Sequence, residues 1–264
     1  MRQNKIFLSF IIILVLYASR KTAYFYAYII FGAENYKNLD ETIKTIIIQT
    51  TGLLLPVLMV AVFNRFSFKK IMSDFGLANG FKEGLLYAAI FVLPMFIGNL
   101  IFSPIRSNIQ YSDVYSLSIW PGFNEELIFR GILIGQLIKR AGWGFIPASL
   151  LSSFYFASGH LYQSHDILSA IQIFLVTASA GVGFALCFIE WSWNLWLPMF
   201  LHILMNLHTV FFDTGNNAAL NLTGNIFRFT TIAFAIFFTI RRIKNKGSFI
   251  KGKLWINKSV TNSE

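Results

Sequence analysis

Asn-Glu-Glu-Leu-Ile-Phe-Arg-Gly, residues 124–131, stands inside an apolar stretch, residues 119–138, that is long enough to cross a membrane as one helix. An ionised side chain near the bilayer centre costs roughly 2.5–3.5 kcal/mol on insertion scales, so charged residues in such stretches are rare and usually functional. Glu126 and Arg130 are four residues apart and share a helix face, where they can neutralise each other. Glu125 points about 100° away from Glu126 and has no obvious local partner, which makes it a candidate general base.

The composition places the chain among integral membrane proteins. Of its 264 residues, 55% are hydrophobic and only 13% are charged, whereas an average soluble domain has roughly 25% charged residues. The net charge of +10 would suggest nucleic-acid binding in a soluble protein. Here the basic residues lie between apolar stretches and near the C-terminus, which is typical of topology signals and lipid-headgroup contacts. We therefore expect the lipid bilayer, and no nucleic acid, as the partner of this charge.

Apolar runs of about 20 residues predict an all-α, polytopic bundle of transmembrane helices. The eight candidate spans are approximately residues 6–19, 46–63, 84–103, 119–138, 143–160, 168–189, 193–212 and 226–240. The first span is the weakest, because Arg20 and Lys21 interrupt it. The aromatic run that follows, residues 24–31, would extend a tilted helix or lie along the interface, and a cleaved signal peptide is an alternative for the whole N-terminal segment.

No linker or internal repeat divides the sequence, so residues 1–264 are predicted to form a single membrane domain. The motif-bearing core would cover about residues 84–212, and residues 241–264 would form a basic, mobile cytoplasmic tail. With eight spans and both termini in the cytoplasm, most Lys and Arg residues fall on the inner side, as the positive-inside rule requires. This orientation puts Glu125 in the outer half of the membrane.

Three further polar residues lie within or at the ends of predicted spans. His160 ends the fifth span, and His202 and Asn206 lie four residues apart on one face of the seventh. Because neighbouring spans alternate in direction, these residues reach a depth similar to that of Glu125. Considered singly, His160 is an ordinary interfacial histidine, and His202 with Asn206 would serve as interhelical hydrogen-bonding residues. Their convergence with Glu125 favours a shared functional site.

These residues resemble the CAAX-protease and bacteriocin-processing family of intramembrane proteases, also called CPBP or Abi proteins. The family pattern is EExxxR, then FxxxH, then HxxxN on separate transmembrane helices, which here reads Glu125 to Arg130, Phe156 to His160 and His202 to Asn206. Gly131 and the approach to the third motif, residues 181–198, are also typical. The resemblance covers roughly residues 84–212, and no motif position departs from the pattern. It implies an active, multi-pass endopeptidase of a bacterial cell membrane.

The resemblance also implies a substrate and a set of catalytic residues. The substrate would be a membrane-associated peptide or protein, with a prenylated C-terminal tail, a bacteriocin leader and a signalling peptide all open. The site residues would be Glu125, Glu126, Arg130, His160, His202 and Asn206. Glu125 would activate water and later protonate the leaving amine, His160 would position the water or the oxyanion, and Asn206 would offer an amide donor to the oxyanion. The alternatives are a non-proteolytic immunity or regulatory scaffold of the same fold and, with less support, a transporter.

Metal dependence is open at this stage. His160 and His202 with Glu125 or Glu126 would make a plausible zinc set with water in the fourth position, and the family is often described as metal-dependent. However, these ligands come from three different helices, unlike the paired histidines of HExxH enzymes, and Glu125 cannot easily be both a ligand and a free base. The sequence therefore favours a metal-independent glutamate–histidine mechanism, with a divalent metal such as zinc as the alternative.

Overall fold

The computed structural model describes residues 2–213 and 220–260, and this part of the chain is built from helices, with two isolated β-bridges and no strand. The predicted all-α class is confirmed. Each predicted span coincides with helical structure. The helices are α1 (Arg2–Phe31), α2 (Ala33–Lys37), α3 (Glu41–Phe63), α4 (Phe68–Phe75), α5 (Phe81–Phe91), α6 (Leu93–Phe102), α7 (Tyr111–Asp113), α8 (Trp120–Glu126), α9 (Gly135–Lys139), α10 (Phe145–Ser158), α11 (Ile167–Glu190), α12 (Trp196–Phe211) and α13 (Leu222–Lys246).

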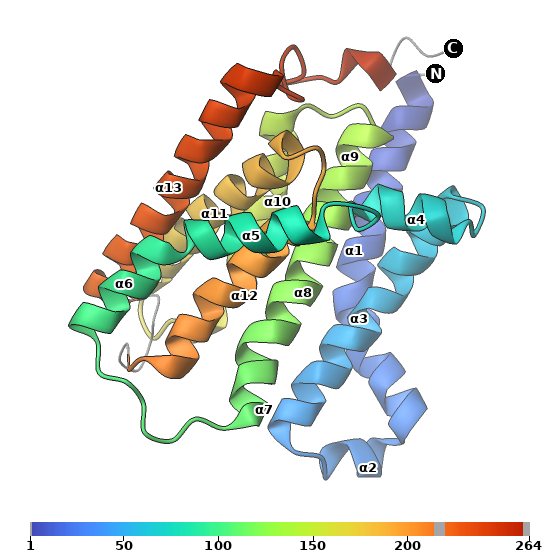
Figure 1. Ribbon diagram of the computed structural model, residues 1–264. Coiled ribbons are helices and arrows are strands. Elements are labelled where there is room, and N and C mark those ends of the chain that lie inside the picture. The colour runs from blue at the N-terminus through green and yellow to red at the C-terminus, as the bar shows by residue number, and fades with distance from the viewer. Residues whose placement is uncertain (1, 214–219, 261–264) are drawn as a thin grey trace.

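Four helical segments in the described part of the chain are long and apolar enough to cross a membrane: Asn4–Phe31, Glu41–Phe63, Phe81–Phe102 and Ile167–Glu190. The other predicted spans are shorter, as in α10 and α12, or carry more charge, as in α13. These four segments support an integral membrane bundle, and the count of eight spans stays a prediction. Figure 1 shows most helices running along one common direction, whereas α4 and α5 lie across the bundle.

The N-terminal hairpin, which we define as α1 to α3 (residues 2–63), differs from its prediction. The predicted end of the first span at residue 19 is wrong, because α1 continues through Arg20 and Lys21 to Phe31 as one 30-residue helix. Lys and Arg have good helix propensity and can extend their charged ends away from apolar surface, so they do not break the helix. The aromatic run therefore extends α1, and α3 packs back against it, with Thr51 Oγ1 donating to the Ala23 carbonyl at 3.0 Å.

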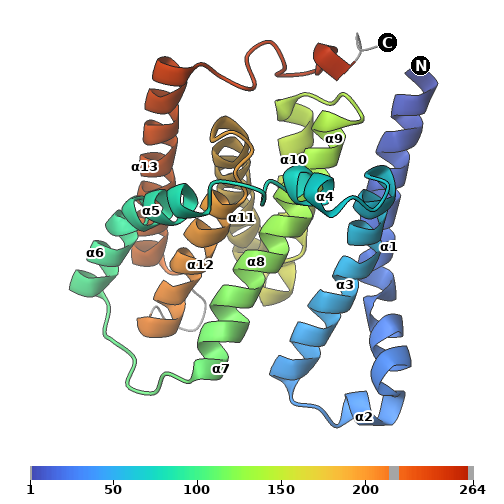
Figure 2. The ribbon, with the colours of Figure 1, turned by 45° about the vertical axis from the view of Figure 1, so that its right-hand side comes forward.

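The C-terminal segment is anchored, so its predicted mobility is wrong for residues 247–260. The buried carboxylate of Glu190 accepts hydrogen bonds from the Ser248 hydroxyl at 2.7 Å and from the backbone N–H groups of Phe249 and Ile250 at 3.1 Å each. Gly144 N–H donates to the Trp255 carbonyl farther along the segment. Figures 1 and 2 show the segment crossing the end of the bundle at which α1 begins.

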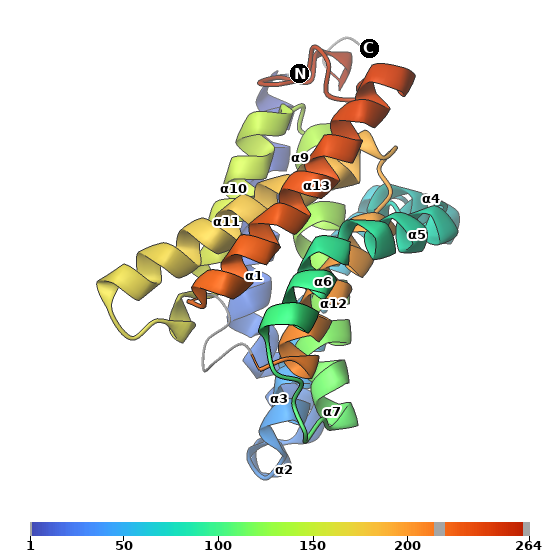
Figure 3. The ribbon, with the colours of Figure 1, turned by 60° about the vertical axis from the view of Figure 1, so that its left-hand side comes forward.

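The motif helix, which we define as the continuous helical segment of residues 111–139, runs through the centre of the bundle. Its residues Ile132, Ile134 and Leu137 are fully buried and belong to the largest of the three apolar clusters in the described residues. Figure 3 shows α10, α11 and α13 covering one side of the bundle while α4 and α5 cross another. This burial fixes the motif helix on several sides and holds its polar residues at defined positions.

Candidate active site

The motif helix changes its hydrogen-bond pattern at the first motif. Two parts of it, Val114–Ile119 and Leu127–Ile134, are π-helical, and the second begins directly after Glu126. π-Helical turns are rare and occur frequently at functional sites. The second one carries Arg130 and Gly131. An added Cβ at Gly131 would lie 3.0 Å from the Leu195 side chain and 3.2 Å from the Phe75 carbonyl, so a small residue lets this turn pack closely.

The predicted pairing of Glu126 and Arg130 is present. Arg130 Nη1 lies 2.9 Å from Glu126 Oε1, and both side chains are fully buried. Arg130 Nη2 also donates to the Gly181 carbonyl at 3.3 Å. The guanidinium lies 4.9 Å from the ring centre of Phe156 and 5.5 Å from that of Phe184. A carboxylate, a carbonyl and two aromatic faces thus compensate a charge that would otherwise be costly to bury.

His202 connects the two carboxylates of the first motif. Its Nδ1 lies 2.8 Å from Glu126 Oε1, and its Nε2 lies 3.8 Å from Glu125 Oε2. An ionised carboxylate only accepts hydrogen bonds, so Nδ1 of His202 carries a proton in this contact. The third motif therefore meets the first through side chains 76 residues apart. The convergence predicted from alternating helix directions is present for Glu125, Glu126 and His202.

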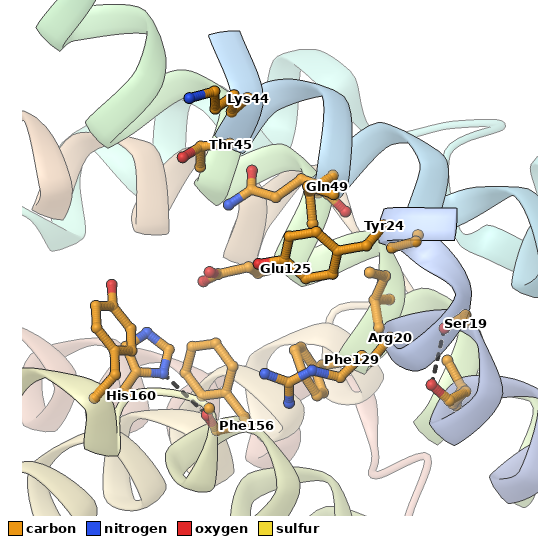
Figure 4. Close-up of a pocket in the computed structure, with 18 of the residues that line it drawn as sticks. Ser19, Arg20, Tyr24, Lys44, Thr45, Gln49, Glu125, Phe129, Phe156 and His160 are labelled. Carbon is orange, nitrogen blue, oxygen red and sulfur yellow. Dashed lines mark hydrogen bonds between the residues drawn. The ribbon is translucent and has the colours of Figure 1, made fainter. Parts of the chain in front are cut away.

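Glu125 faces a cavity. Its side chain is 23% exposed, unlike the fully buried Glu126 beside it. The cavity has a volume of about 630 Å³, and Glu125 and His160 both line it. The motif helix and α10 form one part of the wall, and the N-terminal hairpin forms much of the rest. Figure 4 shows Glu125, His160 and residues of the hairpin around this space.

His160 follows the last turn of α10 and has one ring nitrogen engaged. Its Nδ1 lies 2.9 Å from the Phe156 carbonyl oxygen, a contact drawn as a dashed line in Figure 4. A carbonyl oxygen only accepts, so Nδ1 holds a proton, and Nε2 is the nitrogen left for a ligand. The ring also packs edge to face on Phe156, with centroids 4.6 Å apart. Phe156, the first residue of the second motif, thus orients the histidine that ends it.

Asn206 was predicted to be a site residue but does not line the cavity, whereas the hairpin lines the cavity without having been predicted to. Asn206 is half-buried on α12, one turn beyond His202, and is not among the described residues that line the cavity. Sequence reasoning assigned no function to the hairpin, yet Arg20, Tyr24 and Gln49 line the cavity. Two signals pointed to it: Arg20 interrupts an apolar run, and Gln49 is a polar residue inside the predicted span 46–63.

The donor atoms around Glu125 include the predicted zinc ligands. In residues 2–213 and 220–260, no three His, Cys, Asp or Glu side chains are grouped so that they could hold a metal ion. Of the predicted ligands, His202 donates from Nδ1 to Glu126 and His160 donates from Nδ1 to the Phe156 carbonyl, so each ring keeps Nε2 for another partner. Glu126 Oε1 is shared between Arg130 and His202. We therefore derive no step through a metal.

Comparison with known proteins supports the resemblance. Residues 107–208 match the family model described as Type II CAAX prenyl endopeptidase Rce1-like. The matched segment contains all three motifs, so the predicted likeness to the CAAX-protease family is confirmed over this part of the chain. The N-terminal hairpin and α13 lie outside it. No curated protein and no solved structure matched the chain.

Proposed function

We propose that this chain, with its CAAX-endopeptidase-like segment 107–208, is an intramembrane endopeptidase that cleaves a membrane-associated peptide or protein with a water molecule activated by Glu125. The observation that carries the proposal is the cavity shared by Glu125 and His160. It offers an accessible carboxylate next to an imidazole whose Nε2 is not engaged by the Phe156 carbonyl. The half-exposed environment lets water and a peptide reach a carboxylate that is otherwise surrounded by apolar helices.

The hydrolysis begins with this carboxylate and an oriented water. Glu125 takes a proton from the water while the water oxygen bonds to the scissile carbonyl carbon. The carbon–nitrogen bond then breaks, and Glu125 gives its proton to the leaving amine. One water is consumed, and a carboxylic acid and an amine are formed. His160 Nε2, which accepts hydrogen bonds in the neutral ring, holds the water in line, and in the protonated ring it donates to the oxyanion.

The residues behind Glu125 balance its charge. Glu125 and Glu126 together carry two negative charges and Arg130 carries one positive charge, so the group without His202 is left with one excess negative charge. His202 Nε2 lies 3.8 Å from Glu125 Oε2, so the imidazole faces this excess charge. When Glu125 takes the proton of water, the negative charge moves to the oxyanion of the substrate. His202, Glu126 and Arg130 therefore act as positioning residues that make either charge state of Glu125 tolerable.

Asn206 keeps its predicted role as an amide donor to the oxyanion. It lies one helical turn from His202 on the same helix, which supports a position at the edge of the site. Replacement by alanine tests this role through kcat, since an oxyanion donor acts in the transition state. A loss confined to KM would contradict it.

The test uses purified protein in lipid vesicles with a fluorogenic, farnesylated peptide that ends in C-a-a-X, the prenylation signal. The printed description of the matched family supports this choice of first substrate. The unprenylated peptide and an internal-sequence peptide are the comparison substrates, and mass spectrometry identifies the cleaved bond. We expect cleavage that disappears in Glu125→Gln. A protein that binds these peptides and cleaves none of them, or cleavage that survives Glu125→Gln, would favour the scaffold alternative or another base.

A further inference from the structure

Two side-chain amides in the cavity wall lack hydrogen-bond partners. Asn124 is 1% exposed, and neither Oδ1 nor Nδ2 of its buried carboxamide contacts a partner among the described residues. Gln49, on α3, has a buried Oε1 without a partner in the described chain. Both residues line the cavity that contains Glu125 and His160. Figure 4 shows the amide group of Gln49 reaching into this space.

Such groups call for an explanation because buried polar atoms are almost always hydrogen-bonded. Leaving them unpaired is costly, and an apolar side chain of similar size would avoid that cost. Other buried carboxamides have at least one partner. Asn64 Nδ2 donates to Asp74, and Asn257 Nδ2 donates to the Ile138 carbonyl. Asn99 and Gln136 each have an unpaired nitrogen, but their oxygens accept hydrogen bonds from Ser103 and Arg140. The unpaired amides of Asn124 and Gln49 therefore point to a ligand that fills the cavity during function.

The chemistry of the pair identifies the ligand. A carboxamide carries one acceptor and one donor group, which complement the N–H and C=O of a peptide bond. A prenyl or acyl chain offers neither, so a hydrocarbon occupant would leave both amides unpaired. Asn124 precedes Glu125 in the chain, and Gln49 lies on the stripe of α3 formed by residues 41, 44, 45, 48, 49 and 52, which all line the cavity.

We propose that Gln49 and Asn124 bind the main chain of the substrate peptide on either side of Glu125. This inference rests on the proposed endopeptidase function and deepens it. It assigns peptide recognition to side chains that bind main-chain groups of the substrate, whatever the substrate's side chains are. Gln49 belongs to the N-terminal hairpin, outside the matched segment 107–208. The hairpin thus contributes directly to the peptide site. Pairing with the substrate would place its carbonyl group within reach of water at Glu125.

The experiment measures peptide binding to Glu125→Gln protein in lipid vesicles, so that turnover does not consume the probe. The probe is the farnesylated peptide that ends in C-a-a-X, together with a series in which one backbone amide at a time is N-methylated. The variants are Gln49→Met and Asn124→Leu, which keep side-chain volume and remove the amide. The matched control is Asn99→Leu, since Asn99 is buried with an unpartnered Nδ2 but does not line the cavity.

We expect each cavity variant to bind the unmodified peptide roughly 3- to 10-fold more weakly, the effect of one lost hydrogen bond. N-methylation at one backbone position should weaken binding to the parent but have little further effect in the variant that lacks the partner amide. Because both amides are unpaired without substrate, their removal should leave the melting temperature unchanged or raise it. If the two amides had only a structural role, their removal would lower the melting temperature. Asn99→Leu should bind all probes like the parent.

Two results would overturn the inference: no binding of the unmodified peptide, or N-methylation effects that are equal in parent and variants. If Asn124→Leu fails to fold, Asn124→Ala takes its place in the same cycle. Failure of the proposed function is read separately, from proteins with Glu125 intact. If such a protein cleaves no peptide while the N-methylation pattern is as expected, the result supports the peptide-binding site and contradicts the proposed protease function.

Discussion

The segment that carries the motifs and the N-terminal hairpin share one cavity but are built differently. In α11, which supports the motif helix, 44% of the apolar window is buried inside the protein, whereas the corresponding windows of α1 and α3 are 22% and 28% buried. The polar groups of the motif segment contact one another: Glu126 binds both Arg130 and His202. The polar groups of the hairpin, such as Gln49, face the cavity instead.

This difference separates two tasks. Chemistry needs side chains held to within a fraction of an ångström, and the buried contacts among Glu126, Arg130 and His202 provide that. Recognition of a membrane-embedded peptide needs a wall that can admit it from the side. The hairpin has large apolar side chains exposed along α1, such as Phe7 and Ile29, and a smaller share of its apolar windows is buried than in α11. Elements of this kind open locally at low cost, so we expect substrates to enter past the hairpin.

The largest effect should come from Glu125→Gln in the motif segment. Loss of a general base typically costs about 10²–10⁴-fold in rate. The substitution keeps volume and removes one ionisable group from a side chain that is partly exposed, so the melting temperature should stay close to that of the parent. The measurement is peptide turnover in vesicles together with thermal unfolding. Turnover at the rate of the parent protein would show that Glu125 is not the general base. It would also contradict the division of tasks between the motif segment and the hairpin.

Arg130→Ala should have the next largest effect, and on stability. It removes the cationic partner of the fully buried Glu126 and leaves that carboxylate only its contact with His202, and breaking a buried pair in this way costs about 3–5 kcal/mol in known cases. It also removes the guanidinium from the rings of Phe156 and Phe184. We expect a strongly lowered melting temperature and loss of activity. Arg130→Ala combined with Glu126→Gln should recover part of the stability. An unchanged melting temperature in Arg130→Ala would contradict the structural role of the pair.

Much of the motif segment could be predicted because its determinants are local. The Glu126–Arg130 pair follows from an i,i+4 spacing, and the meeting of Glu125 with His202 follows from alternating helix directions. The hairpin's part in the cavity could not be derived in this way. Contacts between α3 and the motif helix join residues far apart in sequence, and neither Gln49 nor Asn124 belongs to a motif. Only tertiary structure reveals that their amides lack partners.

The structure of the C-terminal segment also depends on contacts with residues far away in the sequence. Its basic composition predicted mobility, yet the buried Glu190 anchors it through three hydrogen bonds from residues 248–250. Glu190 ends α11, and nothing in the local sequence shows which chain will satisfy its carboxylate. Likewise, the end of α1 was misplaced because Arg20 and Lys21 read as loop residues, although they are compatible with a helix.

Asp74→Asn should have a moderate, pH-dependent effect at the end of the bundle where α4 meets α9. Burial raises the pKa of Asp74, but hydrogen bonds from Asn64 and Arg140 outweigh it and hold the pKa below the usual 3.8. A carboxyl group with a lowered pKa in the folded state stabilises above pH 3.8, and that stability is lost as the pH falls through the folded-state pKa. We expect Asp74→Asn to lower stability at pH 7 by about 1.5–3 kcal/mol and to flatten the loss in acid. Thermal unfolding between pH 3 and pH 7 measures both, and an acid profile identical to that of the parent would contradict the role of Asp74.

Arg20→Ala should have a small effect that belongs to the hairpin. The Arg20 guanidinium lies 5.2 Å from the ring centre of Tyr155, so it links α1 to α10 across the cavity. Such a contact is worth about 0.5–1 kcal/mol at an exposed site. We expect a higher KM with little change in kcat, and faster proteolytic nicking near α2. Lys21→Ala is the matched control, because its amine lies over Tyr17 on the same helix. A change in kcat alone would indicate that Arg20 acts in the catalytic step and not in substrate binding.

Chelation should have the smallest effect, and it tests whether the motif segment works without a metal. His160 and His202 come from different helices and each keeps Nε2, but no group of three metal-binding side chains is found among residues 2–213 and 220–260. Glu126, the carboxylate available as a ligand if Glu125 is the base, is shared by Arg130 and His202. Binding zinc would require Glu126 to leave its partners and expose Arg130 to the cost of an unpaired buried charge. We therefore expect the rate of cleavage to be unchanged after exhaustive chelation, with zinc measured by elemental analysis on the same sample. Near-stoichiometric zinc, together with activity that is lost on chelation and restored by zinc, would contradict this mechanism and make Glu126 or Glu125 a ligand.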